Sequence, residues 1–129
     1  LLDIKNAQVK RLEYRTLTET IHPEEQDILC ALPGGRTLSL HLTDGNVYEL
    51  TDNLNNFCAS IPFADAGGGI WTSPSSPLAI LGGNVVVNLR HSGKVGGSRL
   101  TMSDGPDIRF SFRLRGALLR AMENARKQF

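Results

Sequence analysis

The sequence predicts an α+β domain, in which a mainly antiparallel β-sheet is packed by one C-terminal α-helix. Apolar and polar residues alternate on both sides of the Asp44-Gly45 pair, and this pattern is a strong signal for a β-hairpin. Near the end of the chain, apolar residues recur at helical spacing instead. Thirteen Gly and six Pro among 129 residues indicate many turns, which suits a sheet-rich fold. This length fits one domain, residues 1–129, with one core.

The first part of the chain predicts two strands. Tyr14 and several threonines favour a strand over residues 8–18. Pro23 then marks a turn, because proline biases the preceding residue towards an extended conformation. Residues 28–32 form a short apolar strand, which the Pro-Gly-Gly sequence at 33–35 ends.

Residues 37–50 predict a hairpin. Leucine occupies every second position over residues 38–42, so one face of this strand is expected to be buried. Asp44-Gly45 supplies a tight turn, because glycine tolerates the positive φ that a type I′ turn requires. Residues 47–50 are the return strand.

The middle of the chain predicts irregular structure. Phe57 and Phe63 are expected to anchor residues 51–69, which end in a flexible Gly-rich link. A short strand is expected at residues 70–72. Two prolines in the loop at residues 73–77 exclude a central strand there.

A second hairpin follows that loop. Residues 78–81 and 85–89 are apolar and flank the Gly82-Gly83 pair, so we expect them to pair with each other. Glycine and serine dominate residues 92–98, which predict a mobile loop.

The C-terminal part predicts a strand, a turn, a last strand and a helix. Residues 99–102 are the first strand, and Asp104-Gly105 is a second tight turn. Residues 108–114 alternate, with apolar side chains on one side and basic side chains on the other. The helix is expected over about residues 115–128. The residues expected in the core are Leu38, Leu40, Leu42, Ile108, Phe110, Phe112, Leu118 and Met122.

Charge is divided unevenly along the chain. Residues 1–65 contain five Lys or Arg and ten Asp or Glu, whereas residues 66–129 contain nine and three. Such asymmetry steers an acidic partner to one face of a domain, or it is neutralised when the two halves pack together. The sequence leaves both interpretations open.

Cysteine usage favours an intracellular protein. Cys30 and Cys58 lie far apart and form no CxxC motif, so we interpret both as buried reduced thiols, although a disulfide stays open. No apolar run reaches the roughly 20 residues of a membrane span. The chain begins without Met and lacks a signal-peptide core, so we expect a domain excised from a longer protein.

Catalytic motifs are missing from the sequence. The three histidines, His22, His41 and His91, have no metal-ligand spacing. Neither a GxSxG motif nor a Walker A loop is present. We therefore expect a domain that is not an enzyme and holds no metal, nucleotide or other cofactor.

The basic last strand is the feature most relevant to nucleic acid. Binding of nucleic acid combines basic residues with stacking aromatics on one surface. Phe110 and Phe112 are expected on the core side, opposite the arginines. The sequence therefore argues against nucleic acid as the partner, and no feature favours a membrane.

Two segments resemble the polo box. Residues 37–47 resemble its pair of strands joined by a short Asn/Asp-Gly turn, and residues 107–125 resemble its last strand and packing helix. The resemblance implies a domain without catalysis that recruits its host protein to a kinetochore or centrosome, and it leaves a homodimer open. The family's phosphopeptide-gripping His and Lys have no match here, so phosphopeptide binding is not implied.

A pleckstrin-homology-like domain is the alternative, because that superfold also closes a mainly antiparallel sheet with a C-terminal helix. Such a module would bind acidic ligands, either a lipid headgroup, an acidic peptide or nucleic acid, through the basic C-terminal half.

The candidate partner surface combines basic and aromatic side chains. Arginines on the last strand and on the helix would receive an acidic segment of a partner protein, and an aromatic residue beside the Gly-rich stretch would anchor it. The residues of this predicted surface are Arg109, Arg113, Arg115, Arg120 and Trp71.

Overall fold

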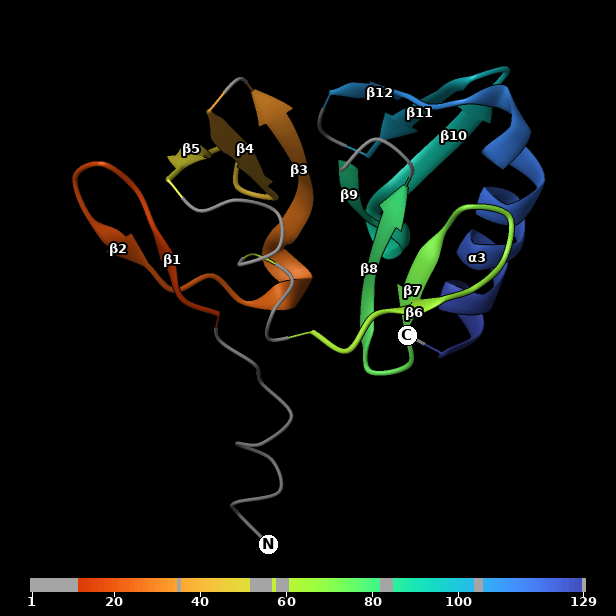
Figure 1. Ribbon diagram of the computed structural model, residues 1–129, viewed down its shortest axis with the longest axis horizontal. Coiled ribbons are helices and arrows are strands. Elements are labelled where there is room, and N and C mark those ends of the chain that lie inside the picture. Colours follow the sequence, from red (N-terminus) through yellow and green to blue (C-terminus); the bar gives the residue numbers. More distant parts are fainter. Residues whose placement is uncertain are drawn as a thin grey trace, which may run out of the picture.

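The strands of the protein form three antiparallel sheets in a computed structural model, which describes residues 12–34, 36–51, 57, 61–81, 85–103 and 106–128. The largest sheet has seven strands and runs through the middle of the molecule (Figure 1). Its strands, in their order across the sheet, are β5 (Val47–Leu50), β4 (Thr37–Leu42), β3 (Ile28–Gly34), β9 (Val85–Asn88), β8 (Ser76–Leu81), β7 (Trp71–Ser73) and β6 (Ala64–Asp65).

The remaining elements lie at the two ends of this sheet. A short hairpin lies beside β5, and a three-stranded sheet with a helix lies at the opposite end (Figure 1). The hairpin is β1 (Tyr14–Arg15) with β2 (Thr20–Ile21), and the three-stranded sheet is β10 (Ser92–Gly96), β11 (Arg99–Met102) and β12 (Asp107–Arg109). The helices are η1 (Glu25–Asp27), η2 (Leu89–His91), η3 (Phe112–Leu114) and α3 (Arg115–Gln128).

The central strands are buried on both faces. Cys30 of β3 pairs with Val87 of β9 and faces one hydrophobic cluster, while their neighbours Ala31 and Val86 face another. The first cluster joins the sheet to α3 and to β10–β12. The second lies on the other face and joins the sheet to β1 and to Phe57. Burial on both faces explains why residues 28–32 are continuously apolar rather than alternating.

One row of paired residues crosses all seven strands and shows which side chains share the face of the second cluster. The middle of the row is fully buried, whereas the residues on β6 and β7 at one end are exposed and the residue on β5 at the other end is half-buried. The row consists of Asp65, Trp71, Ile80, Val86, Ala31, Leu40 and Tyr48.

The predicted fold class is confirmed, because the structure is mainly antiparallel sheet packed by a C-terminal helix. The hairpin of residues 37–50 is formed as predicted. Gly45 has a φ of 90°, and the Asp44 carboxylate accepts a hydrogen bond of 2.9 Å from the backbone N–H of Asn46. Leu38 and Leu40 are buried, while Leu42 is half-buried at the margin of the core.

The C-terminal helix also matches the prediction. Leu118 and Met122 point into the first cluster together with Ala121 and Ala125. Lys127 lies in the last turn, where a positive charge interacts favourably with the helix dipole.

The predicted loop at residues 73–77 is wrong in part, because Pro77 lies inside β8, a central strand. The ladder between β7 and β8 shifts its register between Thr72 and Ser73, and Ser73 then pairs with Ser76. Pro77 therefore adjoins an irregularity in the ladder, and a strand tolerates proline beside such a bulge.

The predicted mobile loop at residues 92–98 is also wrong. Residues Ser92–Gly96 form β10, which pairs with β11 in a ladder that shifts its register between Ser92 and Lys94. The glycines of this segment hide the alternation, because they leave few side chains to mark which face is buried.

Phe112 is the predicted core residue that the structure places outside. The longer strand predicted over residues 108–114 is cut short, because β12 ends at Arg109 and the chain then turns into η3. The backbone N–H of Leu114 donates to the Ser111 carbonyl at 2.8 Å, so the two-residue period is lost. Phe112 is 66% exposed, and Leu114 is buried instead.

The expected flexible link at residues 66–69 is a defined turn. Gly67, Gly68 and Gly69 all have positive φ, and the Asp65 carboxylate accepts a hydrogen bond of 2.8 Å from the backbone N–H of Gly67. A Cβ atom at Gly68 would lie 2.7 Å from that of Ala117. The turn therefore packs closely against the first turn of α3.

Several predictions concern residues outside the described part of the chain. Of the strand predicted at residues 8–18, the structure shows only β1, because the chain turns after Arg15 and β2 begins at Thr20; residues 8–11 lie outside. Cys58 and the Asp104-Gly105 turn lie outside as well.

Candidate functional site

The exposed side of the three-stranded sheet is basic. Leu100 and Ile108 point into the core, so their neighbours along β11 and β12 point outward. Arg99 and Arg109 are exposed and lie directly opposite each other. Lys94 on β10 is exposed on the same side, in register with Thr101.

Arg113 extends this surface beyond the strand. It lies in η3, four residues after Arg109, and its side chain is exposed. We refer to Lys94, Arg99, Arg109 and Arg113 as the basic face.

The basic face has little internal neutralisation. Like charges directly opposite each other on neighbouring strands destabilise a sheet, and Arg99 and Arg109 form such a pair. Asp107 offsets part of this repulsion, because its carboxylate lies 3.8 Å from the Arg99 guanidinium. That ion pair is exposed, so its contribution is small. An anion bound across the two arginines would remove the repulsion.

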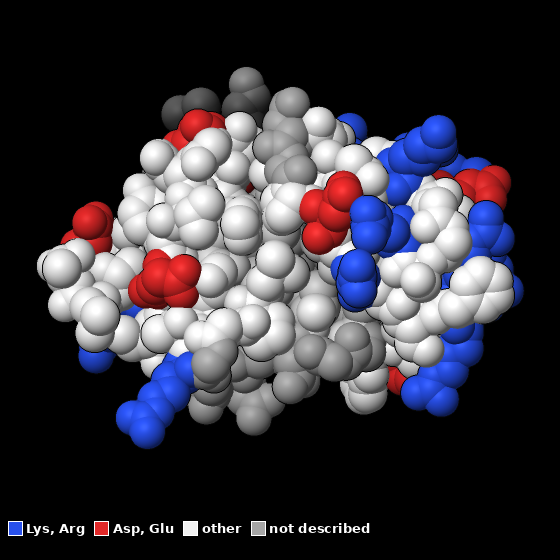
Figure 2. All heavy atoms as spheres, turned by 90° about the horizontal axis from the view of Figure 1, so that it is seen from above, with Lys and Arg blue, Asp and Glu red and all other residues white. Residues whose placement is uncertain are grey.

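The charge asymmetry of the sequence becomes an asymmetry in space. Figure 2 shows Lys and Arg gathered at the end of the molecule formed by β10–β12 and α3, whereas acidic and basic residues are both visible at the other end. The ion pairs of Arg99 with Asp107 and of Lys127 with Glu123 stay within the C-terminal half. The structure therefore concentrates basic residues at one end of the molecule.

An exposed aromatic residue adjoins this basic surface along the chain. Phe112 precedes Arg113 directly, and Phe110 before it is buried. The backbone N–H of Phe110 donates to the Ser98 carbonyl at 3.0 Å, which holds the segment leading to η3 beside the start of β11. The sequence argument against nucleic acid assumed that Phe112 pointed to the core, so that argument no longer holds.

The predicted partner surface is brought together only in part. Arg109 and Arg113 belong to the basic face, although Arg113 lies in η3 and not on the strand. Arg115 begins α3 and is half-buried, and its Nε atom has no hydrogen-bond partner among the described residues. Arg120 is exposed on α3.

Trp71 lies apart from these arginines. It is 46% exposed on β7 and faces the side of the second cluster, whereas α3 packs on the side of the first. Phe63, the other aromatic near the Gly-rich turn, is half-buried against the second cluster.

Sequence reasoning missed Lys94, Arg99 and Phe112. Lys94 fell in a predicted loop, and Phe112 was assigned to the wrong face. The outward position of Arg99 could have been predicted, because Arg99 alternates with Leu100 and Met102 as Arg109 alternates with Ile108.

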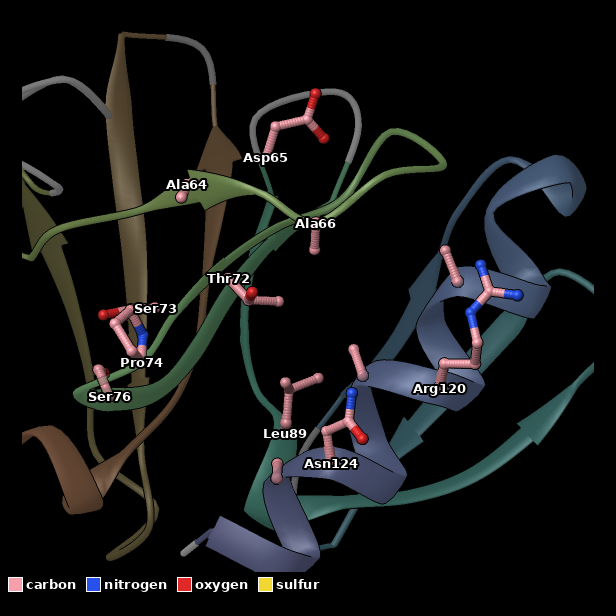
Figure 3. A pocket seen from close by; sticks show the side chains of 13 residues that line it. Ala64, Asp65, Ala66, Thr72, Ser73, Pro74, Ser76, Leu89, Arg120 and Asn124 are labelled. Carbon is pink, nitrogen blue, oxygen red and sulfur yellow. The ribbon is translucent and has the colours of Figure 1, made fainter.

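A groove lies between α3 and the β6–β7 strands (Figure 3). Its volume is about 330 Å³. Thr72 and Asn124 reach into it from opposite walls, while Asp65 and Arg120 stand at its two sides. The helix contributes three alanines, Ala117, Ala121 and Ala125, to the lining beside Arg120 and Asn124.

The reactive side chains in the described residues are isolated. Burial raises the pKa of the Cys30 thiol to about 12, so it stays protonated and unreactive at neutral pH. The His91 ring contacts the Gln26 carbonyl at 2.8 Å, and His22 contacts Glu13 at 3.3 Å. No three His, Cys, Asp or Glu side chains gather in this part of the chain to hold a metal ion. No described helix is long and apolar enough to cross a membrane.

The chain is similar in fold to a known DNA-binding domain. No protein-family model matches it, and comparison with curated proteins finds no match. A solved structure that it does match is the LytTr DNA-binding domain of a methyl-accepting/DNA response regulator from Bacillus cereus, with a TM-score of 0.55 and 13% sequence identity. The match covers 88% of this chain and 96% of that chain.

This likeness corrects the interpretation of the sequence. The resemblance to a polo box is wrong, and recruitment to a kinetochore or centrosome is wrong with it, because the LytTr domain has a different fold. The pleckstrin-homology-like alternative and the argument against nucleic acid are likewise contradicted by a match to a DNA-binding domain. The polo-box motifs misled because any hairpin with an Asp-Gly turn and any final strand with a packing helix would fit them. Over most of its length, the chain shares the fold of a LytTr DNA-binding domain.

Proposed function

We propose that this domain binds DNA through the basic face, without catalysis. The observation that carries the proposal is the exposed pair Arg99 and Arg109, which lie opposite each other with one carboxylate nearby. The fold likeness to a LytTr DNA-binding domain supports the same conclusion. An intracellular location accords with this role and with the free thiol of Cys30.

The chemistry of the basic face suits phosphate groups. A guanidinium group binds phosphate oxygens with two parallel hydrogen bonds and always carries its charge. Three of the four residues of the basic face are arginines. Contacts of this kind position a protein on the duplex and release condensed counterions, so binding weakens as salt rises.

The test is the salt dependence of binding to a fluorescent 30-base-pair duplex of random sequence, measured by anisotropy. We expect the double variant Arg109→Ala/Arg113→Ala to bind more weakly than the unchanged domain. The slope of log K against log salt should fall by about two, since each lost phosphate contact removes roughly one.

The matched control is Arg15→Ala/Arg36→Ala, which removes two exposed arginines outside the basic face, one on β1 and one in the turn between β3 and β4. This control should leave both affinity and slope unchanged. Equal losses in the two double variants, or a domain that binds no duplex at low salt, would contradict the proposal.

A further inference from the structure

The exposed aromatic ring of Phe112 has no packing role that explains it. Its neighbours on both sides, Phe110 and Leu114, are 7% and 4% exposed, whereas Phe112 is 66% exposed. Burying a Phe side chain stabilises a fold, and the fold does not gain this stabilisation at Phe112.

The ring is held outward by the backbone. The Leu114 N–H donates to the Ser111 carbonyl at 2.8 Å, and the Arg115 N–H donates to the carbonyl of Phe112. Buried side chains before and after this turn fix it against the core. A partner would therefore meet a Phe112 side chain on an ordered backbone, and little ordering entropy would be lost on contact.

The surroundings of Phe112 favour nucleic acid as that partner. Arg113 follows it directly, and Arg109 precedes it by three residues; both are exposed. Binding of an apolar protein surface at this place would remove water from the two arginine charges, and this desolvation is costly. DNA offers phosphates for the arginines and flat apolar base surfaces for the ring.

We propose that Phe112 inserts into the base stack of the bound DNA while the arginines of the basic face hold the phosphates. This inference rests on the proposed DNA binding. Apolar side chains that enter between base steps bend the duplex and favour sites where the stack opens easily. Phe112 would thus make the domain selective for DNA that is readily unstacked.

The experiment compares two 30-base-pair duplexes of one sequence, one fully paired and one with a central T·T mismatch next to 2-aminopurine. The unchanged domain should prefer the mismatched duplex by roughly 5- to 150-fold, the range for stacking of a base on an aromatic ring. It should also raise 2-aminopurine fluorescence as the base leaves the stack.

Two variants test the contribution of the Phe112 aromatic ring. Phe112→Ala should bind both duplexes equally and leave 2-aminopurine fluorescence unchanged, whereas Phe112→Trp should retain the preference. Leu17→Ala is the matched control, because Leu17 is 84% exposed between β1 and β2 at the other end of the molecule. It should behave as the unchanged domain does.

The outcomes separate this inference from the proposed function. If the unchanged domain binds neither duplex, DNA binding itself is wrong. If it binds both and Phe112→Ala keeps the same preference and fluorescence change, insertion is wrong and DNA binding stands. If Phe112→Ala weakens both complexes equally and the unchanged domain leaves 2-aminopurine stacked, Phe112 contacts the outside of the duplex and insertion is again overturned.

Discussion

At the scale of single residues, two phenylalanines that look equivalent in the sequence have opposite environments. Phe110 is 7% exposed and packs in the first cluster, while Phe112 is 66% exposed. We expect Phe110→Ala to lower the free energy of unfolding by about 3–5 kcal/mol. Phe112→Ala should change it by less than about 0.5 kcal/mol. Urea denaturation measures both, and equal costs would place Phe112 in the core.

Glu49 provides a prediction of pH dependence. Hydrogen bonds from the Ser39 and Thr37 hydroxyl groups, both 2.7 Å long, hold the pKa of this carboxyl below its ordinary value. Its contribution to stability is therefore present above the pKa of the unfolded chain and is lost as pH falls through the folded pKa. Glu49→Gln should lower the melting temperature at pH 7, and this difference should shrink below about pH 4.5.

The control for Glu49 is Glu19→Gln, at an exposed position next to β2. The difference between its melting temperature and that of the unchanged domain should change less with pH than the difference for Glu49→Gln. A Glu49→Gln variant whose deficit stays constant from pH 7 to pH 3 would show that the two hydroxyl groups do not favour the charged carboxylate.

At the scale of elements, the Gly-rich turn before β7 supports the start of α3, and so the position of η3. A Cβ atom added at Gly68 would meet Ala117 at 2.7 Å, and one added at Gly69 would meet Leu114 at the same distance. Leu114 belongs to η3, which carries Phe112 and Arg113. The turn thus links the seven-stranded sheet to the proposed DNA-binding surface.

Gly68→Ala should therefore destabilise the domain more than Gly67→Ala does. Gly67 also has positive φ, but nothing lies within 4 Å of a Cβ atom there. Both alanine variants carry backbone strain, and only Gly68→Ala adds a clash, worth about 1–3 kcal/mol. Chemical denaturation of the two variants gives this difference directly, and equal stability would mean that the turn is not packed on α3.

At the scale of the whole molecule, the sheet divides the protein into two regions with different roles. The second cluster and the hairpins around it have mixed charge, whereas β10–β12, η3 and α3 carry most of the described basic residues. Figure 2 shows this separation as a basic end. The first cluster joins the sheet to that end, so the surface proposed to bind DNA rests on a packed core rather than on loops.

The sequence by itself determined the elements whose patterns are local. The hairpin of residues 37–50 and the C-terminal helix follow from periods of two and 3.6 residues, which depend only on neighbours along the chain. The basic character of residues 109–115 was visible for the same reason. The polo-box resemblance failed because these local patterns occur in many folds.

Only the tertiary structure decided how these elements combine into a surface. Arg99 and Arg109 face each other because β11 pairs with β12, and Lys94 joins them because β10 pairs with β11. Phe112 is exposed because η3 breaks the alternation that the strand had begun. The pairing of strands and the position of turns depend on contacts between distant segments. The spacing of apolar residues within one segment therefore does not predict them.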